Sequence, residues 1–277
     1  MTTPHITVLG SRGFIGSHLI QFLNQQKFSY WAPNREDETV FTKPLGHVIY
    51  CIGLTADFRS RPLDTIEAHI CLLKQFIEKA EFESLTYLSS TRVYAGVDDT
   101  REAQSLMVNP CNASDLYNLS KLMGESLCLH CGRPNMKIAR LSNIVGVCNE
   151  PTNFLTQLLE EGYRNGSILL RTALSSKKDY LSMDDAVELL TKIAFSTSSG
   201  IFNVASGENT ENGEIARCIE RECGFRIEVM PAAPVWEFSR IDLTKIKAEF
   251  GFNPTAFSVY FPKFLNAYQK KRTPCLI

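Results

Sequence analysis

The stretch Gly10-Ser11-Arg12-Gly13-Phe14-Ile15-Gly16 decides the fold of this chain. It follows the apolar run His5–Leu9, which predicts a strand, and it opens a segment with apolar residues at helical spacing. Glycines at a strand-to-helix turn let the backbone bend tightly and approach a pyrophosphate at the helix N-terminus. The stretch therefore predicts a dinucleotide-binding turn, the alternative being a tight turn without a ligand. Its residues expected at the cofactor are Gly10, Arg12, Gly13, Phe14, Ile15 and Gly16.

Short apolar runs alternate with helical periodicity over the first 145 or so residues. Further strands are predicted at Phe28–Ala32, Val48–Ile52, Leu85–Ser89 and Lys137–Leu141, and helices at Thr65–Ala80 and Asp115–Cys131. This alternation is typical of parallel strands joined by crossover helices. Because only residues 33–47 separate the second strand from the third, we expect the crossover helix there to be short or absent.

The rhythm changes after Gly146. Helices are predicted at Asn153–Arg164, Asp184–Phe195 and Asn212–Cys223, among brief strands such as Ile201–Val204. No internal repeat or low-complexity linker is found. We therefore expect a main domain over residues 1–150 and a smaller lobe over residues 151–277, with strands and helices that return to the main sheet.

Composition excludes several function classes. The 277 residues are 44% apolar and 21% charged, and 29 Lys and Arg balance 30 Asp and Glu, so we expect a globular protein that binds neither nucleic acid nor a membrane surface. The first residues lack the basic region of a secretory signal, and the longest apolar run, Val48–Leu54, is far short of a membrane span. We expect a cytoplasmic protein. Nine scattered cysteines indicate reduced thiols, and the Cys128–Cys131 pair lacks a partner pair for a metal site.

The end of the second predicted strand bears on the choice of dinucleotide. An acidic residue there accepts hydrogen bonds from the adenosine ribose of NAD, but this chain reads Ala32-Pro33-Asn34-Arg35. Guanidinium groups bind phosphates in bidentate fashion, so Arg12 and Arg35, with Asn34, favour the 2′-phosphate of NADP. Two alternatives remain: Glu36 and the acids after it would restore an NAD ligand, and Arg35 would then be an exposed loop charge.

A tyrosine and a lysine lie on one face of the predicted helix at 115–131. A neighbouring ammonium such as Lys121 stabilises a phenolate and brings the pKa of Tyr117, ordinarily about 10, closer to working pH. Ser90 follows a predicted strand, at the sheet edge where open α/β folds bind ligands. Taken alone, the Tyr–Lys pair is also compatible with a solvent-exposed helix face. The order of glycine turn, serine and Tyr–Lys pair along the chain is a more specific sign of a catalytic site. The positions expected to make the core contact of this helix are Leu119, Leu122, Met123 and Leu127.

With these motifs the chain resembles extended short-chain dehydrogenases/reductases of the nucleotide-sugar epimerase, dehydratase and reductase group. The G-x-x-G-x-x-G spacing is that of the extended type. Three further stretches resemble family motifs: Arg140–Gly146, with a substrate-contacting Asn143; Lys178–Asp185, with Lys178 for the usual Arg; and Gly200–Gly207. The resemblance implies an α/β fold with a Rossmann-type doubly wound parallel sheet, a smaller C-terminal substrate-binding lobe and a nucleoside-diphosphate sugar substrate. Gly53, Tyr117 and Lys121 complete the expected cofactor contacts.

The reaction is chosen by what the motif at the strand end lacks. Dehydratases of the group carry Thr-Asp-Glu where this chain has Ser90-Thr91-Arg92, and neither a hydroxyl nor a guanidinium replaces that carboxylate pair. A short chain, the NADP-like pocket and the Ser239–Lys245 stretch, which resembles that of deoxysugar 4-keto reductases, favour reduction; helix capping is the alternative for that stretch.

The resemblance implies the roles of the remaining site residues. NADPH delivers hydride to the sugar C4 carbonyl, Tyr117 supplies the proton, Ser90 hydrogen-bonds the same oxygen, and Lys121 tunes Tyr117 and holds the nicotinamide ribose. The residues expected to contact the substrate are Thr91, Arg92, Asn143 and Arg240.

Other activities and an assembly remain open at this point. A 4-epimerase with retained NAD(P) would use the same residues, and a non-catalytic NADP sensor would not need a proton donor. Many relatives dimerise through the helix that carries the tyrosine, so we expect a homodimer. The candidate contacts are Leu122, Met123 and Leu129 with Ile66, Ile70, Leu73 and Ile77, unless these residues face the sheet.

Overall fold

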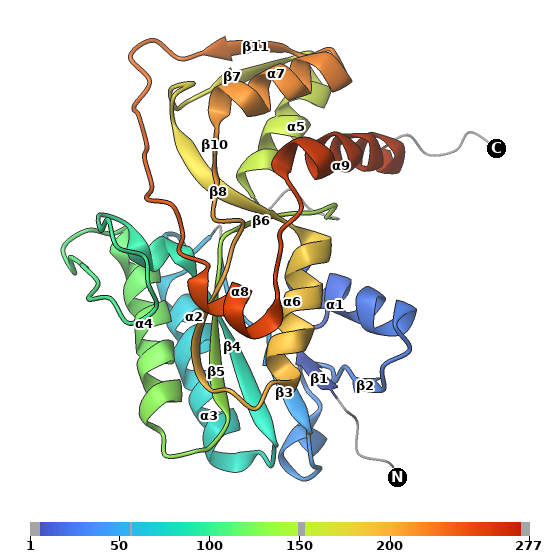
Figure 1. Ribbon diagram of the computed structural model, residues 1–277, viewed down its shortest axis with the longest axis vertical. Coiled ribbons are helices and arrows are strands. Elements are labelled where there is room, and N and C mark those ends of the chain that lie inside the picture. Colours follow the sequence, from blue (N-terminus) through green and yellow to red (C-terminus); the bar gives the residue numbers. More distant parts are fainter. Residues whose placement is uncertain (1–5, 56, 149–152, 273–277) are drawn as a thin grey trace.

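A parallel six-stranded sheet forms the main domain, in the order β2-β1-β3-β4-β5-β9 (Figure 1). The structure, a computed structural model, describes residues 6–55, 57–148 and 153–272. The strands are β1 (Ile6–Leu9), β2 (Tyr30–Trp31), β3 (His47–Tyr50), β4 (Ser84–Ser90), β5 (Met136–Leu141) and β9 (Gly200–Val204). The predicted Rossmann-type sheet is thereby confirmed. Because β1 pairs with β2 on one side and β3 on the other, the strand order reverses beside β1, where open α/β sheets bind ligands.

The β2 edge of this sheet is shorter than predicted. Only Tyr30 and Trp31 pair with β1, whereas the sequence indicated Phe28–Ala32. Pro33 cannot donate to a ladder and follows directly, which limits the strand. A single 3₁₀ turn at Glu38–Phe41 then leads to β3, as the short separation predicted. Compared with the doubly wound order 3-2-1-4-5-6, the described sheet lacks the outermost strand.

Helices cover both faces of the sheet (Figure 1). On one face lie α1 (Phe14–Gln25) and α6 (Met183–Phe195), and on the other lie α2 (Pro62–Ile66), α3 (Leu72–Lys79) and α4 (Asp115–His130). Leu73 and Ile77 of α3 are buried in the core between helix and sheet. These two residues were predicted as dimer contacts, and that part of the prediction is wrong, because the sheet already covers them.

The helix predicted at Thr65–Ala80 is interrupted. It begins three residues earlier, with Pro62 in the first turn, and Glu67–Cys71 form a π turn between α2 and α3. Proline suits the first turn of a helix because its missing N–H has no partner there in any case. Turns of the π type widen the helix locally and are frequent at functional sites. Here the wide turn carries His69, whose side chain is fully buried.

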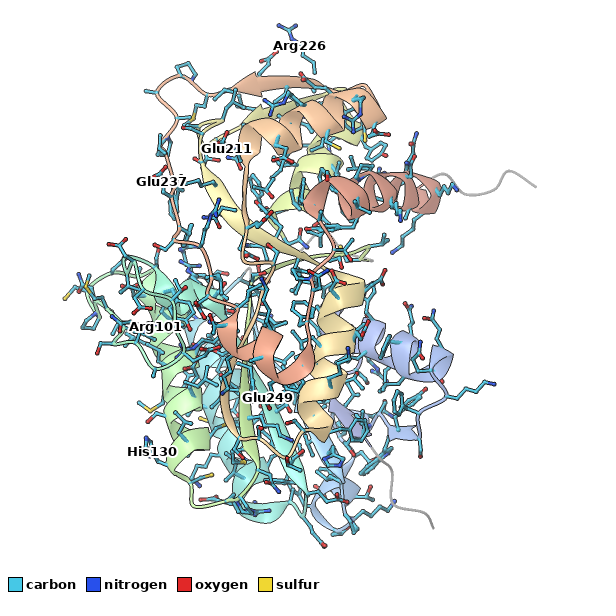
Figure 2. The ribbon with its side chains drawn as sticks, viewed as in Figure 1. Arg101, His130, Glu211, Arg226, Glu237 and Glu249 are labelled. Atoms are coloured by element: carbon cyan, nitrogen blue, oxygen red, sulfur yellow. The ribbon has the colours of Figure 1, made fainter. Side chains whose placement is uncertain are left out.

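Helix α4 packs with the opposite face from the one predicted. Its buried residues are Tyr117, Asn118, Ser120, Lys121, Gly124, Glu125 and Cys128. Met123 is 56% exposed, and Leu119, Leu122 and Leu127 are only half-buried. The polar face packs inward because its groups find partners there, and because Gly124 lets the helix approach the Tyr87 ring. His130 marks the end of α4 farthest from the smaller lobe (Figure 2).

The smaller lobe carries two small sheets of its own. Strands β6 (Asn143–Val145), β8 (Lys177–Ser182) and β10 (Asn209–Glu211) form one, and β7 (Ser167–Leu170) and β11 (Arg226–Val229) form the other. They pack with α5 (Phe154–Asn165), α7 (Asn212–Cys223) and α9 (Phe257–Arg272), while α8 (Thr244–Phe250) packs on β9 of the main sheet. Among the described residues, no helix combines the length and apolar character that crossing a bilayer requires.

Candidate active site

A cleft of about 680 Å³ opens at the carboxyl edge of the main sheet, beneath the smaller lobe. It is lined by most of the residues predicted for cofactor, catalysis and substrate. These are Gly13, Phe14, Ile15, Gly53, Ser90, Thr91, Arg92, Tyr117, Lys121 and Asn143. The sequence separates these residues by up to 130 positions, and the strand order brings them to one place.

The glycine turn fits a phosphate group. Gly10 has a φ of +82°, and a Cβ on Gly16 would lie 2.3 Å from the Gly10 carbonyl oxygen, so both positions require glycine. Helix α1 begins after Gly13 without a side-chain cap. The first N–H groups of a helix have no partner within the helix and carry a partial positive charge. This turn therefore offers unpaired donors, close backbone approach and access to the cleft, as a dinucleotide pyrophosphate needs.

Arg12, Asn34 and Arg35 lie outside the cleft lining, beside the β2 edge. A guanidinium nitrogen of Arg12 donates a 2.7 Å hydrogen bond to Oδ1 of Asn34, which joins the glycine turn to the loop after β2. Both residues and the neighbouring Arg35 are exposed. The structure thus brings two of the three residues predicted for the 2′-phosphate into direct contact and leaves Arg35 one position along the same loop.

Tyr117 is buried at the base of the cleft. Burial raises the pKa of its phenol, while hydrogen bonds with the side chains of Ser90 and Thr55 and the charge of Arg92 act in the opposite direction. The net effect is upward, so the phenol keeps its proton at neutral pH, and the expected lowering of this pKa by Lys121 is not found. In this state Tyr117 is a proton donor, and Ser90 is close enough to share the same acceptor.

Lys121 lies one helical turn after Tyr117. Its Nζ donates a 2.9 Å hydrogen bond to the Leu88 carbonyl at the end of β4 and lies 5.8 Å from the centre of the Tyr117 ring. Burial lowers the pKa of Lys121 to about 7, against the charge of Glu125, which raises it. Lys121 can therefore gain or lose its proton near neutral pH, which changes the charge of the cleft.

His69 lies behind the cleft lining, with its ring centre 5.6 Å from that of Tyr117, and was not predicted. The Leu54 amide donates a 3.2 Å hydrogen bond to Nε2 of His69, so the imidazole proton is on Nδ1, which lies 2.8 Å from the Ser120 hydroxyl. Ser120 in turn donates to the Tyr117 carbonyl oxygen at 2.8 Å. Burial lowers the pKa of His69 to about 2, which keeps the ring neutral. A lone histidine within a helix gives no sequence signal for this role, because the π turn that aims it inward is not visible in the sequence.

Glu125 and Arg140 form a buried ion pair behind the site. The two side chains are each 3% exposed, with a shortest distance of 2.6 Å, and Glu125 also accepts a 2.5 Å hydrogen bond from Ser89. Arg140 continues to the Tyr94 hydroxyl at 2.7 Å. This pair fixes α4 against β4 and β5 next to Ser90. Its only sequence signal is the position of Glu125, four residues after Lys121.

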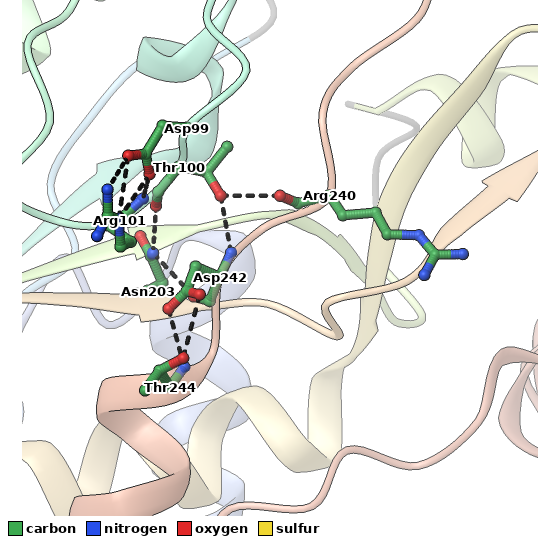
Figure 3. Close-up of polar contacts among 7 residues, drawn as sticks. All are labelled: Asp99, Thr100, Arg101, Asn203, Arg240, Asp242 and Thr244. Carbon is green, nitrogen blue, oxygen red and sulfur yellow. Dashed lines mark hydrogen bonds and ion pairs between the residues drawn. The ribbon is translucent and has the colours of Figure 1, made fainter.

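Arg240 does not reach the cleft. It borders a second hollow of about 760 Å³, and its side chain is exposed and points away from the neighbouring contacts in Figure 3. Alternate residues of an extended segment point in opposite directions, so Ser239 and Ile241 line the cleft instead. The structure therefore does not bring the Arg240 side chain together with the other predicted substrate contacts.

The segment around Arg240 is held by hydrogen bonds to the loop after β4 and to β9 (Figure 3). Its carbonyl accepts a 2.8 Å hydrogen bond from the Thr100 hydroxyl, which also accepts from the Asp242 amide at 2.8 Å. The Asn203 amide donates to the carbonyls of Thr100 and Asp242 at 2.9 and 3.0 Å. These contacts hold the loop after β4 and the segment before α8 on β9.

The fold is similar to that of several solved structures. MoeE5 in complex with UDP-glucose and NAD is 17% identical, with a TM-score of 0.81 over 96% of this chain and 99% of that chain. UDP-glucuronic acid 4-epimerase from Bacillus cereus, in complex with NAD, is 16% identical, with a TM-score of 0.80 over 97% and 99%. RMD from Pseudomonas aeruginosa, complexed with NADPH, is 20% identical, with a TM-score of 0.77 over 97% and 100%. At these identities the likeness establishes the fold.

The sequence itself supplies the family. No curated protein matches the chain. The family model described as NAD dependent epimerase/dehydratase family matches residues 6–205, which include the glycine turn, the cleft serine and the Tyr–Lys pair. The chain therefore belongs to the NAD-dependent epimerase/dehydratase family and is an enzyme of the extended short-chain dehydrogenase/reductase type.

Proposed function

We propose that this enzyme reduces the 4-keto group of a nucleoside-diphosphate sugar with NADPH. The observation that carries the proposal is the convergence of Ser90, Tyr117 and Lys121 with the glycine turn on one cleft. No carboxylate pair stands beside Ser90, where Thr91 and Arg92 follow, so elimination of water lacks its acid and base. What the site provides is one proton donor beside a dinucleotide turn.

Each residue has a role that follows from its position. NADPH, when bound, supplies the hydride. The Tyr117 phenol donates the proton to the carbonyl oxygen of the substrate, and the Ser90 hydroxyl stabilises the charge that develops on that oxygen. Lys121, in its protonated form, stabilises the resulting phenolate and is placed to hold the nicotinamide ribose. Asn143 lines the substrate side of the cleft, where its amide donates to the Asp179 carbonyl at 2.8 Å.

The protonated phenol of Tyr117 suits the first step of a reduction. Reduction begins with a proton on the phenol, and burial raises the pKa of Tyr117 so that the proton is present. Epimerisation begins with oxidation of a hydroxyl, for which the phenolate is the required base. The same residues serve both reactions, so a 4-epimerase with retained NAD(P) is the second candidate. A non-catalytic NADP sensor has no use for the donor.

The cofactor and the setting complete the proposal. Arg12, Asn34 and Arg35 favour NADP over NAD, because a carboxylate for the ribose is absent from the end of β2. We place the reaction in the cytoplasm and expect a homodimer.

The test compares the amount of NADPH consumed with the amount of product formed. Purified protein receives a panel of nucleotide-linked 4-keto sugars, both 6-deoxy sugars and hexuronic acids, with NADPH, and separately 4-hydroxy sugars with catalytic NADP⁺. We expect a fall in absorbance of the reduced nicotinamide in proportion to product with the keto sugars. Inversion of a 4-hydroxy sugar without net consumption would establish the epimerase instead.

The first variant to assay is Tyr117→Phe, which keeps the ring packing and removes the proton donor. We expect its rate to fall about 10²- to 10⁴-fold, with NADPH affinity unchanged. Phe225→Tyr, on the far side of the smaller lobe, is the matched control and should retain full activity. A Tyr117→Phe enzyme as fast as the native one would contradict the assignment of the donor.

A further inference from the structure

Three cations line the cleft without an acidic partner. They are Arg59, Arg92 and Lys178, and in the described parts of the chain no carboxylate oxygen lies within 4 Å of any of them. The buried acid of the cleft, Asp179, is already occupied. Its carboxylate accepts hydrogen bonds from the Ser206 amide at 3.0 Å, the Ser206 hydroxyl at 2.9 Å and the Gly207 amide at 2.7 Å. Asp57 also lines the cleft, and the charge of Asp115 acts on Arg92, but neither acid forms an ion pair with the three cations, so their positive charge is available to a ligand.

Two of the cations lie at the reacting end of the cleft. The guanidinium carbons of Arg59 and Arg92 lie 4.5 and 5.2 Å from the centre of the Phe58 ring, and that of Arg92 lies 5.7 Å from the centre of the Tyr117 ring. Both are tethered to Ser114, Arg59 by a 2.9 Å bond to the hydroxyl and Arg92 by a 3.3 Å bond to the carbonyl. These contacts fix two like charges next to the proton donor.

The third cation comes from the smaller lobe. Lys178 of β8 is surrounded by Phe154, Trp236 and Phe238, with its Nζ 5.4 to 5.9 Å from the three ring centres. Aromatic faces attract a cation but do not neutralise it. Burial and the charge of Arg92 both lower the pKa of Lys178, so the two cations act on each other. Like charges near each other in this way are each stabilised by an anionic group that binds beside them.

A diphosphate alone does not account for this arrangement. A nucleoside diphosphate linked to a sugar carries one negative charge on each phosphate, and Lys178 in the smaller lobe is placed to meet it. The arginine pair beside Tyr117 faces the position of the sugar. Guanidinium groups match a carboxylate in bidentate fashion, whereas a neutral hydroxymethyl or methyl group would leave both arginines without a counter-charge.

We infer that the sugar of the substrate carries a carboxylate, so that the enzyme acts on a nucleoside-diphosphate hexuronic acid, with Arg92 and Arg59 holding the acid group. The inference rests on the proposed function and makes it more specific. It also gives a purpose to Arg92, which stands where dehydratases of the group have a carboxylate.

Binding distinguishes the charge of the sugar from that of the diphosphate. Protein saturated with NADP⁺ is titrated calorimetrically with UDP-glucuronic acid and UDP-glucose, and with the two thymidine diphosphate counterparts, so that the base does not decide the result. We expect the uronic acid to bind about 10- to 100-fold more tightly than the neutral sugar. Arg92→Gln should remove this preference and leave the affinity for the neutral sugar nearly unchanged, and Arg59→Gln should reduce it.

Lys178→Gln is the matched control, because it should weaken both sugars of a pair to the same extent. Retained NADP⁺ binding shows that each variant is folded. Equal affinities in the native enzyme, or an equal loss for both sugars in Arg92→Gln, would assign the arginines to the diphosphate and overturn the inference. If none of the four compounds binds while NADP⁺ does, the nucleotide-sugar assignment itself fails, and the inference fails with it.

Discussion

The environment of Lys121 should make the free energy of unfolding depend measurably on pH. Its ordinary pKa is 10.5, and burial lowers the pKa in the folded protein to about 7. Between these values the unfolded chain binds a proton that the folded chain has released, so the free energy of unfolding rises with pH through this window. The rise from one group is at most about 1.4 kcal/mol per pH unit.

We expect Lys121→Met to flatten this rise between pH 7 and 8, measured by urea unfolding of the cofactor-free protein. The second buried lysine, Lys137, has its pKa lowered to about 8 and contributes mainly above that pH. Lys137→Met is therefore the control, and it should leave the slope between pH 7 and 8 nearly intact. Equal slopes in the native protein and in Lys121→Met would contradict the assignment.

A substitution of Arg35 tests whether the enzyme prefers NADPH to NADH. The purified protein should bind NADPH more tightly than NADH, and Arg35→Ala should lose about tenfold or more in NADPH affinity, because only NADP carries the 2′-phosphate. NADH affinity should stay unchanged. Fluorescence titration with both cofactors decides this, and Asn34→Ala should show a smaller loss because it frees Arg12 without removing its charge. A native preference for NADH would reject the assignment.

Residues with a family motif were predictable, and residues that act through geometry were not. Ser90, Tyr117 and Lys121 meet in the cleft as their order along the chain indicated. His69 was missed because its role depends on a π turn and on a contact with Ser120, 51 residues away. Arg240 was assigned from a motif, but its side chain lines the second hollow and not the cleft, since a motif does not specify which side of an extended segment faces a ligand.

The glycine turn is the element whose geometry has least tolerance. A Cβ on Gly16 would lie 2.3 Å from a backbone oxygen, whereas a Cβ on Gly13 would lie 3.3 Å from the same atom. Gly16→Ala should therefore displace the turn, cost about 1 to 3 kcal/mol of stability and abolish NADPH binding. Gly13→Ala is the matched variant and should unfold close to the native temperature. Thermal unfolding with cofactor fluorescence measures both, and indistinguishable variants would mean that the turn is more adaptable than its contacts indicate.

Helix α4 shows why hydrophobic periodicity failed for one element. The pattern assigned the leucine positions to the core, but the helix buries Tyr117, Lys121 and Glu125, each satisfied by a specific partner or by the cleft. Chemistry and a buried ion pair together outweigh the apolar pattern, because polar groups with partners are stable inside. The apolar face of α4 is therefore left pointing outward.

At the scale of the whole molecule, the outward face of α4 favours the predicted homodimer. Met123 and Leu129 are 56% and 45% exposed on that face, and Leu63 of the neighbouring α2 is 83% exposed. We expect a dimer in sedimentation at micromolar concentration, and a monomer for the double variant Met123→Glu, Leu129→Glu. Val259→Glu on α9, where the valine is 49% exposed, is the control and should stay dimeric. Native protein that sediments only as a monomer would reject the dimer.

The short β2 edge bears on how long the cofactor stays bound. The strand has two residues, and a single 3₁₀ turn stands where a doubly wound sheet continues with a further strand. The adenosine half of a dinucleotide therefore meets a narrow support, held mainly by exposed side chains. Differences in affinity among related binding sites appear chiefly in the dissociation rate of the ligand. A reductase has to release its spent dinucleotide in every cycle, while an epimerase keeps one molecule through many. If the enzyme is the reductase proposed above, the short outer edge of the sheet fits the brief cofactor residence that net reduction requires.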